Sequence, residues 1–297
     1  MRSFTAGMGK SKAGKEEGDI PQNLPLSSLN QQGKARGESS RSNTDLAVEV
    51  RRLKLNGCPE IVVVGTSLGG LHALEVLLAG LPDNLPVPMA ITQHRHRDSD
   101  DSLCVFLQGH CALPLKEAED KEVILPGRVY LAPADYHLLV EAGYSHQVTT
   151  KDMALPALQR TNDTSENNMV SQRNLQDRQK VGVPTFALST EAPVLHARPS
   201  IDALFESAAD AYGEKIIGVL LTGASNDGSQ GLIKIKANGG LVIVQDPTSA
   251  ESPTMPKAAI SAFKQQRSTN AAIAVDWILP LHDIAPLIVN LCHLALR

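Results

Sequence analysis

The sequence predicts an α/β fold, a doubly wound and mostly parallel sheet in a three-layer αβα sandwich. From Pro59 onwards, short β-branched runs alternate with segments of helical pattern. This alternation is typical of βαβ units, which build parallel sheets. Right-handed crossovers would then place helices on both faces of the sheet. The length of 297 residues and the 42% hydrophobic content allow a sizeable core.

The elements can be assigned in chain order. An unbroken β-branched run predicts the first strand over 61–64, and the glycine after it leads into a helix over 70–79. The remaining apolar runs predict strands over 88–93, 128–132, 136–141, 216–221 and 241–245. Further helices are expected over 103–109, 201–212 and 228–237, and Pro199-Ser200 opens the second of these three.

Two polar segments are expected to lie outside this core. Residues 1–57 are rich in Ser, Gly, Asn, Gln and Lys and poor in aromatics, which predicts a flexible tail. Residues 145–197 are similarly polar and, apart from a short VPTFALST, show no sustained period. We therefore expect one folded domain over 58–297 with a long disordered insertion at 145–197.

Composition excludes several classes of function. The formal net charge is -4 and the pI about 6.1, so the overall balance does not indicate nucleic-acid binding. The four cysteines show neither paired CxxC spacing nor the density of a disulfide scaffold. The N-terminus lacks the apolar segment of a secretory signal, and no run approaches the roughly 18 apolar residues of a membrane span. The sequence therefore predicts a soluble, cytoplasmic protein.

Three polar residues follow directly after predicted strands. Ser67 lies in GTSLGG after the first strand, His94 follows the second, and Asp227 lies in the turn after the strand 216–221. The carboxyl ends of parallel strands meet at one edge of the sheet, where ligands and catalytic groups collect. An imidazole can activate a serine hydroxyl, and a carboxylate on the other ring nitrogen fixes the tautomer. Their joint placement predicts a Ser-His-Asp triad.

Each residue also has another interpretation. GTSLG fits a nucleophile elbow, but a glycine-rich turn can also hold a phosphate, although neither the dinucleotide fingerprint nor a phosphate-loop lysine is present. His94 and His96 form an H-x-H pair that could bind metal, without a third ligand at a convincing spacing. Asp246 competes with Asp227 as the carboxylate, since it too follows a strand. The order Ser, His, Asp differs from that of α/β-hydrolases and indicates another esterase framework.

Six ordered segments carry a family resemblance: IVVVGTSLGG, ITQH, LPGRVYLAPADYHLLVE, RPSIDALFESAADAYG, GVLLTGASNDGSQGL and GGLVIVQDPTSAESPTMPKAAI. Together they resemble the catalytic domain of bacterial chemotaxis protein-glutamate methylesterases, the CheB family, over most of residues 59–262. The resemblance implies hydrolysis of glutamate γ-methyl esters on chemotaxis receptors, with methanol released, and glutamine deamidation in some members. It also implies that residues 58–297 form a methylesterase catalytic domain.

The resemblance also implies roles for residues. Ser67 would be the nucleophile, His94 the general base and then acid, Asp227 its orienter, and the Ala224 amide part of the oxyanion hole. No metal or cofactor is implied, and the partners would be receptor helices and other chemosensory array proteins, with neither nucleic acid nor membrane insertion. The alternative is a non-catalytic regulatory or scaffold module that keeps the fold.

The sequence departs from the family pattern at several places. Leu68 replaces a threonine beside the nucleophile, and Ala224 replaces a methionine. His94 is followed by Arg95-His96-Arg97 where Met-Pro is usual. The 1–57 segment is too short and too polar for the receiver domain that many members carry, so control by phosphorylation in cis is not expected.

Overall fold

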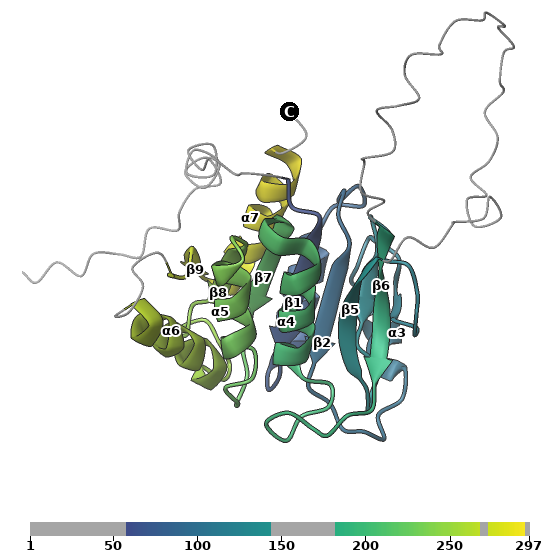
Figure 1. The fold of residues 1–297 in the computed structure, drawn as a ribbon, viewed down its shortest axis with the longest axis horizontal. Helices are drawn as coiled ribbons and strands as arrows, with labels where there is room; N and C mark the ends of the chain where they lie inside the picture. The colour runs from purple at the N-terminus through teal and green to yellow at the C-terminus, as the bar shows by residue number, and fades with distance from the viewer. Residues whose placement is uncertain (1–57, 144–181, 268–272, 295–297) are drawn as a thin grey trace, which may run out of the picture. The chain divides into compact units, whose positions relative to one another are not determined.

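The computed structural model describes residues 58–143, 182–267 and 273–294 (Figure 1). The predicted tail over 1–57 and residues 145–181 of the predicted insertion lie outside these ranges. None of the helices in the described ranges is both long and apolar enough to cross a membrane.

A seven-stranded sheet forms the centre of the fold, and every neighbouring pair in it is parallel. Its spatial order is β3 (Leu115–Glu117), β4 (Val129–Leu131), β2 (Met89–Gln93), β1 (Ile61–Thr66), β7 (Ile216–Leu220), β8 (Leu241–Gln245) and β9 (Trp277–Leu279). The central strands β1, β7 and β8 are buried at every position. A parallel sheet covered on both faces needs such continuous apolar runs, which explains the uninterrupted IVVV of β1.

Helices cover both faces of this sheet, as the predicted three-layer sandwich requires. The described part of the chain has the α-helices α2 (Gly70–Ala79), α3 (Ser102–Gln108), α4 (Ile201–Tyr212), α5 (Ser229–Ala237), α6 (Thr254–Arg267) and α7 (Leu281–Leu294), with a short 3-10 turn, η1 (Gly213–Lys215), after α4. Val62 and Val64 face the core formed with α2, α3 and α7. Ile61 and Val63 face the opposite core, formed with α4, α5 and α6. Alternate β1 residues thus supply both cores, because strand side chains point to opposite faces.

A small antiparallel hairpin corrects one sequence prediction. The strand expected over 136–141 is found as β5 (His137–Gly143), but it pairs with β6 (Gly182–Ser189) in a separate sheet. Phe186 of β6 is fully buried and packs edge-on against Tyr130, with ring centroids 4.9 Å apart. The prediction that residues 145–197 form a disordered insertion is therefore wrong over 182–189, which form β6. These residues become a strand because β5 and the core behind it supply distant partners.

Other predicted elements are found close to their expected bounds, and some elements were missed. The short edge strands β3 and β9 and the helices α6 and α7 were not predicted. A strand of three residues gives too little alternation to be read from sequence. Helix α7 contains Pro286, a residue that usually ends a helix.

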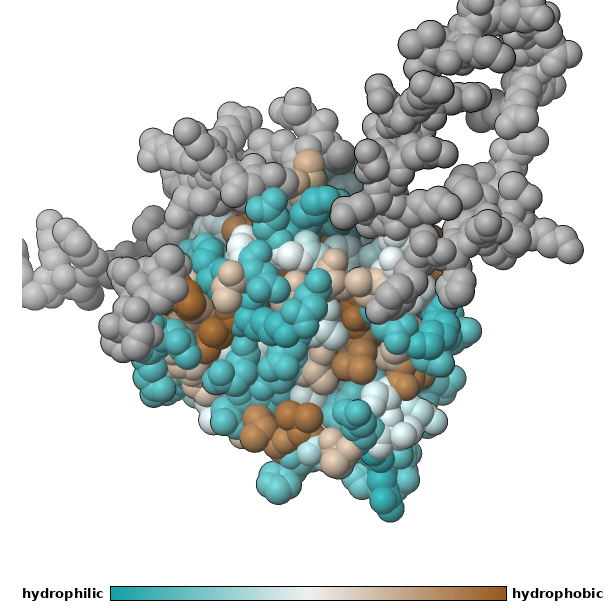
Figure 2. Space-filling view, in the orientation of Figure 1, coloured by the Kyte–Doolittle hydropathy of each residue, from teal (hydrophilic) through white to brown (hydrophobic). Residues whose placement is uncertain are grey.

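The sheet topology places three chain segments side by side. In the order β2-β1-β7, the chain continues from β1 to one side and later returns to the other, which makes the carboxyl end of β1 a topological switch point. Figure 1 shows α4 and α5 in front of these strands. The same view as a space-filling surface shows hydrophilic residues over the middle of this face, with hydrophobic residues on both sides of them and at the lower edge (Figure 2). That edge is the carboxyl end of the strands.

Candidate active site

Ser67 stands in the tight connection between β1 and α2. Its amide donates to Thr222 O at 3.0 Å, and its carbonyl accepts from the Gly70 amide at 2.9 Å. Gly69 has a φ of 79°, in the left-handed region that favours glycine. A Cβ on Gly70 would lie 2.0 Å from Gln93 Oε1, so no side chain fits there without displacing Gln93. The glycines after Ser67 are therefore required by conformation and by space.

Gln93, at the end of β2, ties the Ser67 turn to the His94 segment. Its Nε2 donates to Ser67 O at 3.0 Å and to His94 O at 2.8 Å. His94 also continues the sheet, because its amide donates to Thr66 O at 3.0 Å. Sequence reasoning missed Gln93. The only signal was a polar residue at the last position of an otherwise apolar strand.

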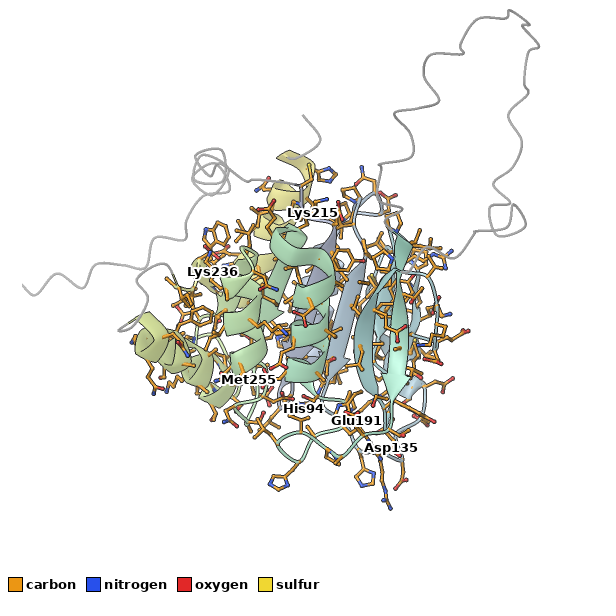
Figure 3. All side chains as sticks on the ribbon, in the orientation of Figure 1. His94, Asp135, Glu191, Lys215, Lys236 and Met255 are labelled. Carbon is orange, nitrogen blue, oxygen red and sulfur yellow. The ribbon has the colours of Figure 1, made fainter. Side chains whose placement is uncertain are left out.

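Asp227 contacts His94 from the turn after β7. His94 Nε2 and Asp227 Oδ2 are 2.7 Å apart, and the Asp227 side chain is fully buried. This bond occupies Nε2, so the second ring nitrogen, Nδ1, is the one available to another group. Figure 3 shows His94 at the lower end of the described fold, with Lys215 at the opposite end.

The first turn of α4 supplies the other partners of Asp227. The Ile201 amide donates to Oδ2 at 2.7 Å, the Asp202 amide to Oδ1 at 2.9 Å, and the Ser200 hydroxyl to Oδ1 at 3.0 Å. Burial acts to raise the pKa of Asp227, but the bonds from His94 and from the Asp202 and Ile201 amides outweigh it and hold this pKa below its ordinary value. A helix N-terminus favours such a negative charge.

Two of these residues, Ser200 and Asp202, were not predicted as part of the site. Ser200 was identified only as the start of a helix, and it does cap α4 by accepting from the Ala203 amide. Asp202 is buried and accepts from the Gly231 amide at 2.7 Å. Burial, and then the neighbouring carboxylates of Asp227 and Glu206, raise its pKa to about 7. Nothing in the local sequence indicates that α4 reaches Asp227.

The turn after β7 also approaches Ser67. A Cβ on Gly223 would lie 3.0 Å from Ser67 Cβ, so the two backbones are in close contact. Thr222 Oγ1 donates to Leu68 O at 2.9 Å and fixes the register of the two turns. Ala224 is exposed, and no residue in the described ranges accepts a hydrogen bond from its amide. This amide is available to a bound oxyanion.

The structure separates the rival residues from this cluster. The Asp246 carboxylate accepts from the amide and hydroxyl of Thr248, both at 2.8 Å, and so stabilises its own turn. His96 is 75% exposed and lies 3.4 Å from Asp98, whereas His94 bonds Asp227. Across the described ranges, no group of three or more His, Cys, Asp or Glu side chains could hold a metal ion. Within the described residues, no hydrogen bond joins the Ser67 hydroxyl to His94.

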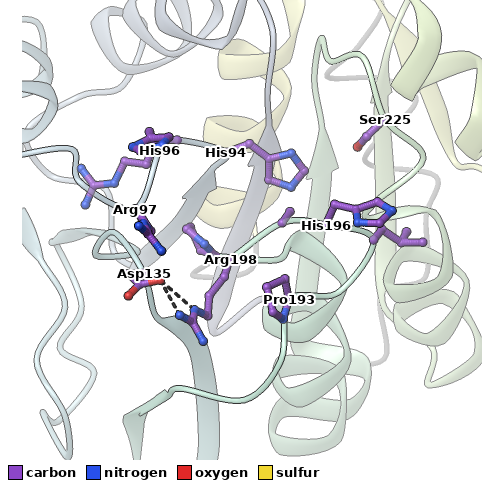
Figure 4. A pocket seen from close by; sticks show the side chains of 12 residues that line it. His94, His96, Arg97, Asp135, Pro193, His196, Arg198 and Ser225 are labelled. Atoms are coloured by element: carbon purple, nitrogen blue, oxygen red, sulfur yellow. Dashed lines mark hydrogen bonds and ion pairs between the residues drawn. The ribbon is translucent and has the colours of Figure 1, made fainter.

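A pocket of about 520 Å³ opens beside His94 (Figure 4). One wall is the segment after β2, and the other is the loop before α4. Its lining is rich in basic side chains: His94, Arg95, His96, Arg97, His196 and Arg198, with Asp135 as the one acidic residue among those that line it.

Known proteins share this architecture. The model of the CheB methylesterase family matches residues 62–288. A relative from Leptospira interrogans is 39% identical over 232 residues, which cover 78% of this chain and 94% of the relative. One from Thermotoga maritima, named protein-glutamate methylesterase/protein-glutamine glutaminase, is 30% identical, and the match covers 78% of this chain and 54% of the relative.

A solved structure gives the same result. The crystal structure of the Thermotoga maritima CheB methylesterase catalytic domain superposes with a TM-score of 0.60 at 30% identity and covers 78% of this chain and 98% of that chain. The predicted family, enzyme class and fold class are thus confirmed. The chain belongs to the CheB methylesterase family.

Proposed function

We propose that this protein hydrolyses glutamate γ-methyl esters on methyl-accepting signalling receptors, with Ser67 as nucleophile, His94 as base and Asp227 as its orienter. The observation that carries the proposal is the 2.7 Å contact between His94 Nε2 and a fully buried, ionised Asp227 at the sheet edge where Ser67 also lies. The names of relatives support the reaction, since the Thermotoga protein is called a protein-glutamate methylesterase.

The contacts suggest how the steps would run. Ser67 Oγ attacks the ester carbonyl and passes its proton to His94 Nδ1, because Asp227 already occupies Nε2. The Ala224 amide and the N-terminus of α2 stabilise the oxyanion. The carbon–oxygen bond to the methoxy group then breaks, and methanol leaves with the proton from His94. Water attacks the acyl-enzyme by the same route, which restores Ser67 and leaves a glutamate carboxylate.

A glutamine side chain would follow the same steps with ammonia as the leaving group. The glutaminase part of the Thermotoga relative's name supports this second activity. The site of action would be the cytoplasm, and the partners would be receptor helices and other chemosensory proteins. A scaffold that only kept the fold would not need four hydrogen-bond partners arranged around the buried carboxylate of Asp227.

Incubation with a methylated receptor fragment, followed by detection of methanol, tests the proposal. The parent protein should release methanol and Ser67→Ala should release none, whereas the control Ser261→Ala, at an exposed position on α6, should match the parent. A serine-reactive fluorophosphonate should label Ser67. Methanol release by Ser67→Ala at the parent rate would exclude Ser67 as nucleophile. A protein that neither releases methanol nor takes the label would be the scaffold alternative.

A further inference from the structure

The pocket beside His94 is lined by three arginines, on a domain that is acidic as a whole. Residues 58–297 contain 18 lysines and arginines against 26 aspartates and glutamates. Arg95, Arg97 and Arg198 line the pocket together with Asp135. Glu117 pairs with Arg95 and Asp135 pairs with Arg198, so the least compensated charge is that of Arg97, whose nearest carboxylate oxygen, on Asp98, lies 3.7 Å away. Figure 4 shows His94 and His96 on one side of the space and His196 and Arg198 on the other. An arginine that is left uncompensated at a concave site attracts negatively charged groups.

Arg198 builds one wall of the pocket. Its Nε and Nη2 donate to Asp135 Oδ1 at 3.0 and 2.5 Å, and its Nη1 donates to Thr190 O and Glu191 O at 2.9 and 3.0 Å. With these bonds formed, most of the donor capacity of the guanidinium is used inside the protein. Arg198 therefore fixes the loop before α4 and leaves substrate contacts to other residues.

Arg95 and Arg97 form the opposite wall and are held differently. Arg95 is 7% exposed, pairs with Glu117 and donates to Ala132 O at 3.2 Å, while its buried Nε has no partner in the described part of the chain. Arg97 is 72% exposed, and its Nε lies 3.7 Å from Asp98 Oδ1, beyond hydrogen-bond distance. Arg97 is thus the most exposed of the three arginines that line the pocket, and no hydrogen bond within the described residues uses its donors.

We propose that this pocket binds carboxylate side chains that flank the reacting methyl-glutamate in the protein substrate, with Arg97 as the main contact. The proposal rests on the proposed function, because it places the ester between Ser67 and His94 and its neighbours in the pocket. The methyl ester is neutral, so the positive charge selects the surrounding sequence. The pocket's volume of about 520 Å³ lies within the range of ligand-binding pockets. Arginine also suits carboxylates through paired donors.

Two synthetic peptides test this with the full chain. Each carries one γ-methyl glutamate; one has glutamates three and four residues away on both sides, the other has alanines there, positions that share a helix face with the ester. The parent should show about five- to tenfold higher kcat/KM for the acidic peptide at low ionic strength, and the ratio should fall towards one at high salt. Arg97→Glu should abolish or invert the ratio.

The matched control is Arg128→Glu. Arg128 is an exposed arginine directly before β4, so it lies at the amino end of that strand, whereas the pocket lies at the carboxyl ends of the strands. This variant should keep the parent ratio. Equal kcat/KM for the two peptides in the parent, or an unchanged ratio in Arg97→Glu, would overturn the proposal. Inorganic phosphate should inhibit hydrolysis of the acidic peptide more strongly. Equal inhibition with both peptides, relieved by Arg97→Glu, would mean that the pocket takes a free anion instead.

A binding measurement separates this proposal from the proposed function. Fluorescence anisotropy of the same peptides with Ser67→Ala reports the pocket without turnover. Tighter binding of the acidic peptide, lost in Ser67→Ala/Arg97→Glu, would support the pocket even if the parent released no methanol. If both peptides bind equally and the parent releases methanol from the alanine peptide, the proposed esterase function would stand and the proposal of a subsite for acidic side chains would be wrong.

Discussion

Asp227 joins the parts of the candidate site at the scale of single residues. A buried carboxylate is costly unless it is paired and hydrogen-bonded, and this one accepts from His94, Ser200, Ile201 and Asp202. The lowered pKa means that it is charged at neutral pH. The fixed negative charge of Asp227 beside Nε2 keeps the proton on Nε2, so Nδ1 is an acceptor.

Replacement of Asp227 by asparagine should reduce kcat on the order of 10⁴, because an amide stabilises the wrong tautomer of His94 and no longer balances its positive charge. Steady-state methanol release measures this loss, and KM should change much less. Asp246→Asn is the matched control, since Asp246 was the competing candidate and its carboxylate accepts from Thr248 in its own turn. A kcat for Asp227→Asn within tenfold of the parent would remove Asp227 from the mechanism.

Asp202 lies directly behind Asp227 and titrates in the opposite sense. Its amide donates to Asp227, but its own carboxyl group is buried beside that charge, so its pKa is raised from 3.8 to about 7. A carboxyl group whose pKa is higher in the folded state binds more protons when folded. Its stabilising contribution is fully present below the unfolded pKa and is lost as the pH rises through the folded value.

The free energy of unfolding of the parent should therefore decline between about pH 4 and pH 7, compared with Asp202→Asn. Asparagine cannot ionise, yet its carbonyl oxygen can still accept from the Gly231 amide, so the helix contact is kept. Urea unfolding of both proteins at several pH values across this window measures the difference. Parallel pH profiles would show that Asp202 has the same pKa in the folded and unfolded states.

The connection from β1 to α2 shows how an element end controls the site. Ser67 lies between the last residue of β1 and the first turn of α2, and both glycines that follow it lie against other segments. Gly69 is close to Glu251, and Gly70 is close to Gln93. The turn is therefore shaped by residues from two other parts of the chain.

Gly70→Ala should lower kcat by on the order of tenfold or more, because the new Cβ displaces the Gln93 amide that joins Ser67 to His94. The control is Gly213→Ala, where φ is 58° and no other atom lies within 4 Å of the added Cβ. That variant should lose about 1–3 kcal/mol of stability through backbone strain and keep its kcat. Kinetics and thermal unfolding of both proteins measure the contrast. An unchanged kcat in Gly70→Ala would mean that the Gln93 bridge is dispensable.

Elements with a strong local pattern could be predicted, and those stabilised by distant partners could not. The strand β1 was evident from IVVV, whereas β6 is a strand because β5 pairs with it and Tyr130 packs against Phe186. The same holds at the site. Ser67, His94 and Asp227 each follow a strand, so their shared edge was predictable, and their catalytic roles stay predictions. Ser200 and Gln93 act across the fold on segments that are remote in sequence, which a local pattern cannot report.

At the scale of the whole molecule, the two cores have different relations to the site. Helices α4 and α5 pack on one face of the sheet, and the first turn of α4 holds Asp227. Phe205 of α4 is fully buried in this core, and a Cβ on Gly231 of α5 would lie 2.4 Å from Phe205 Cβ. Helix α7 belongs to the opposite core, where Leu287 is fully buried.

Truncation of either core residue should cost stability, but only one should affect the reaction. Phe205→Ala should lose about 3–5 kcal/mol and Leu287→Ala about 2–5 kcal/mol, as cavities in well-packed cores do. Phe205→Ala should also lower kcat, because a loosened α4 moves the Ile201 and Asp202 amides away from Asp227 and so disturbs His94. Leu287→Ala should keep the parent kcat, measured at a temperature where both variants remain folded. Equal kcat losses in the two would mean that the sheet transmits packing defects to its edge from either face, and that α4 has no special role in holding the site.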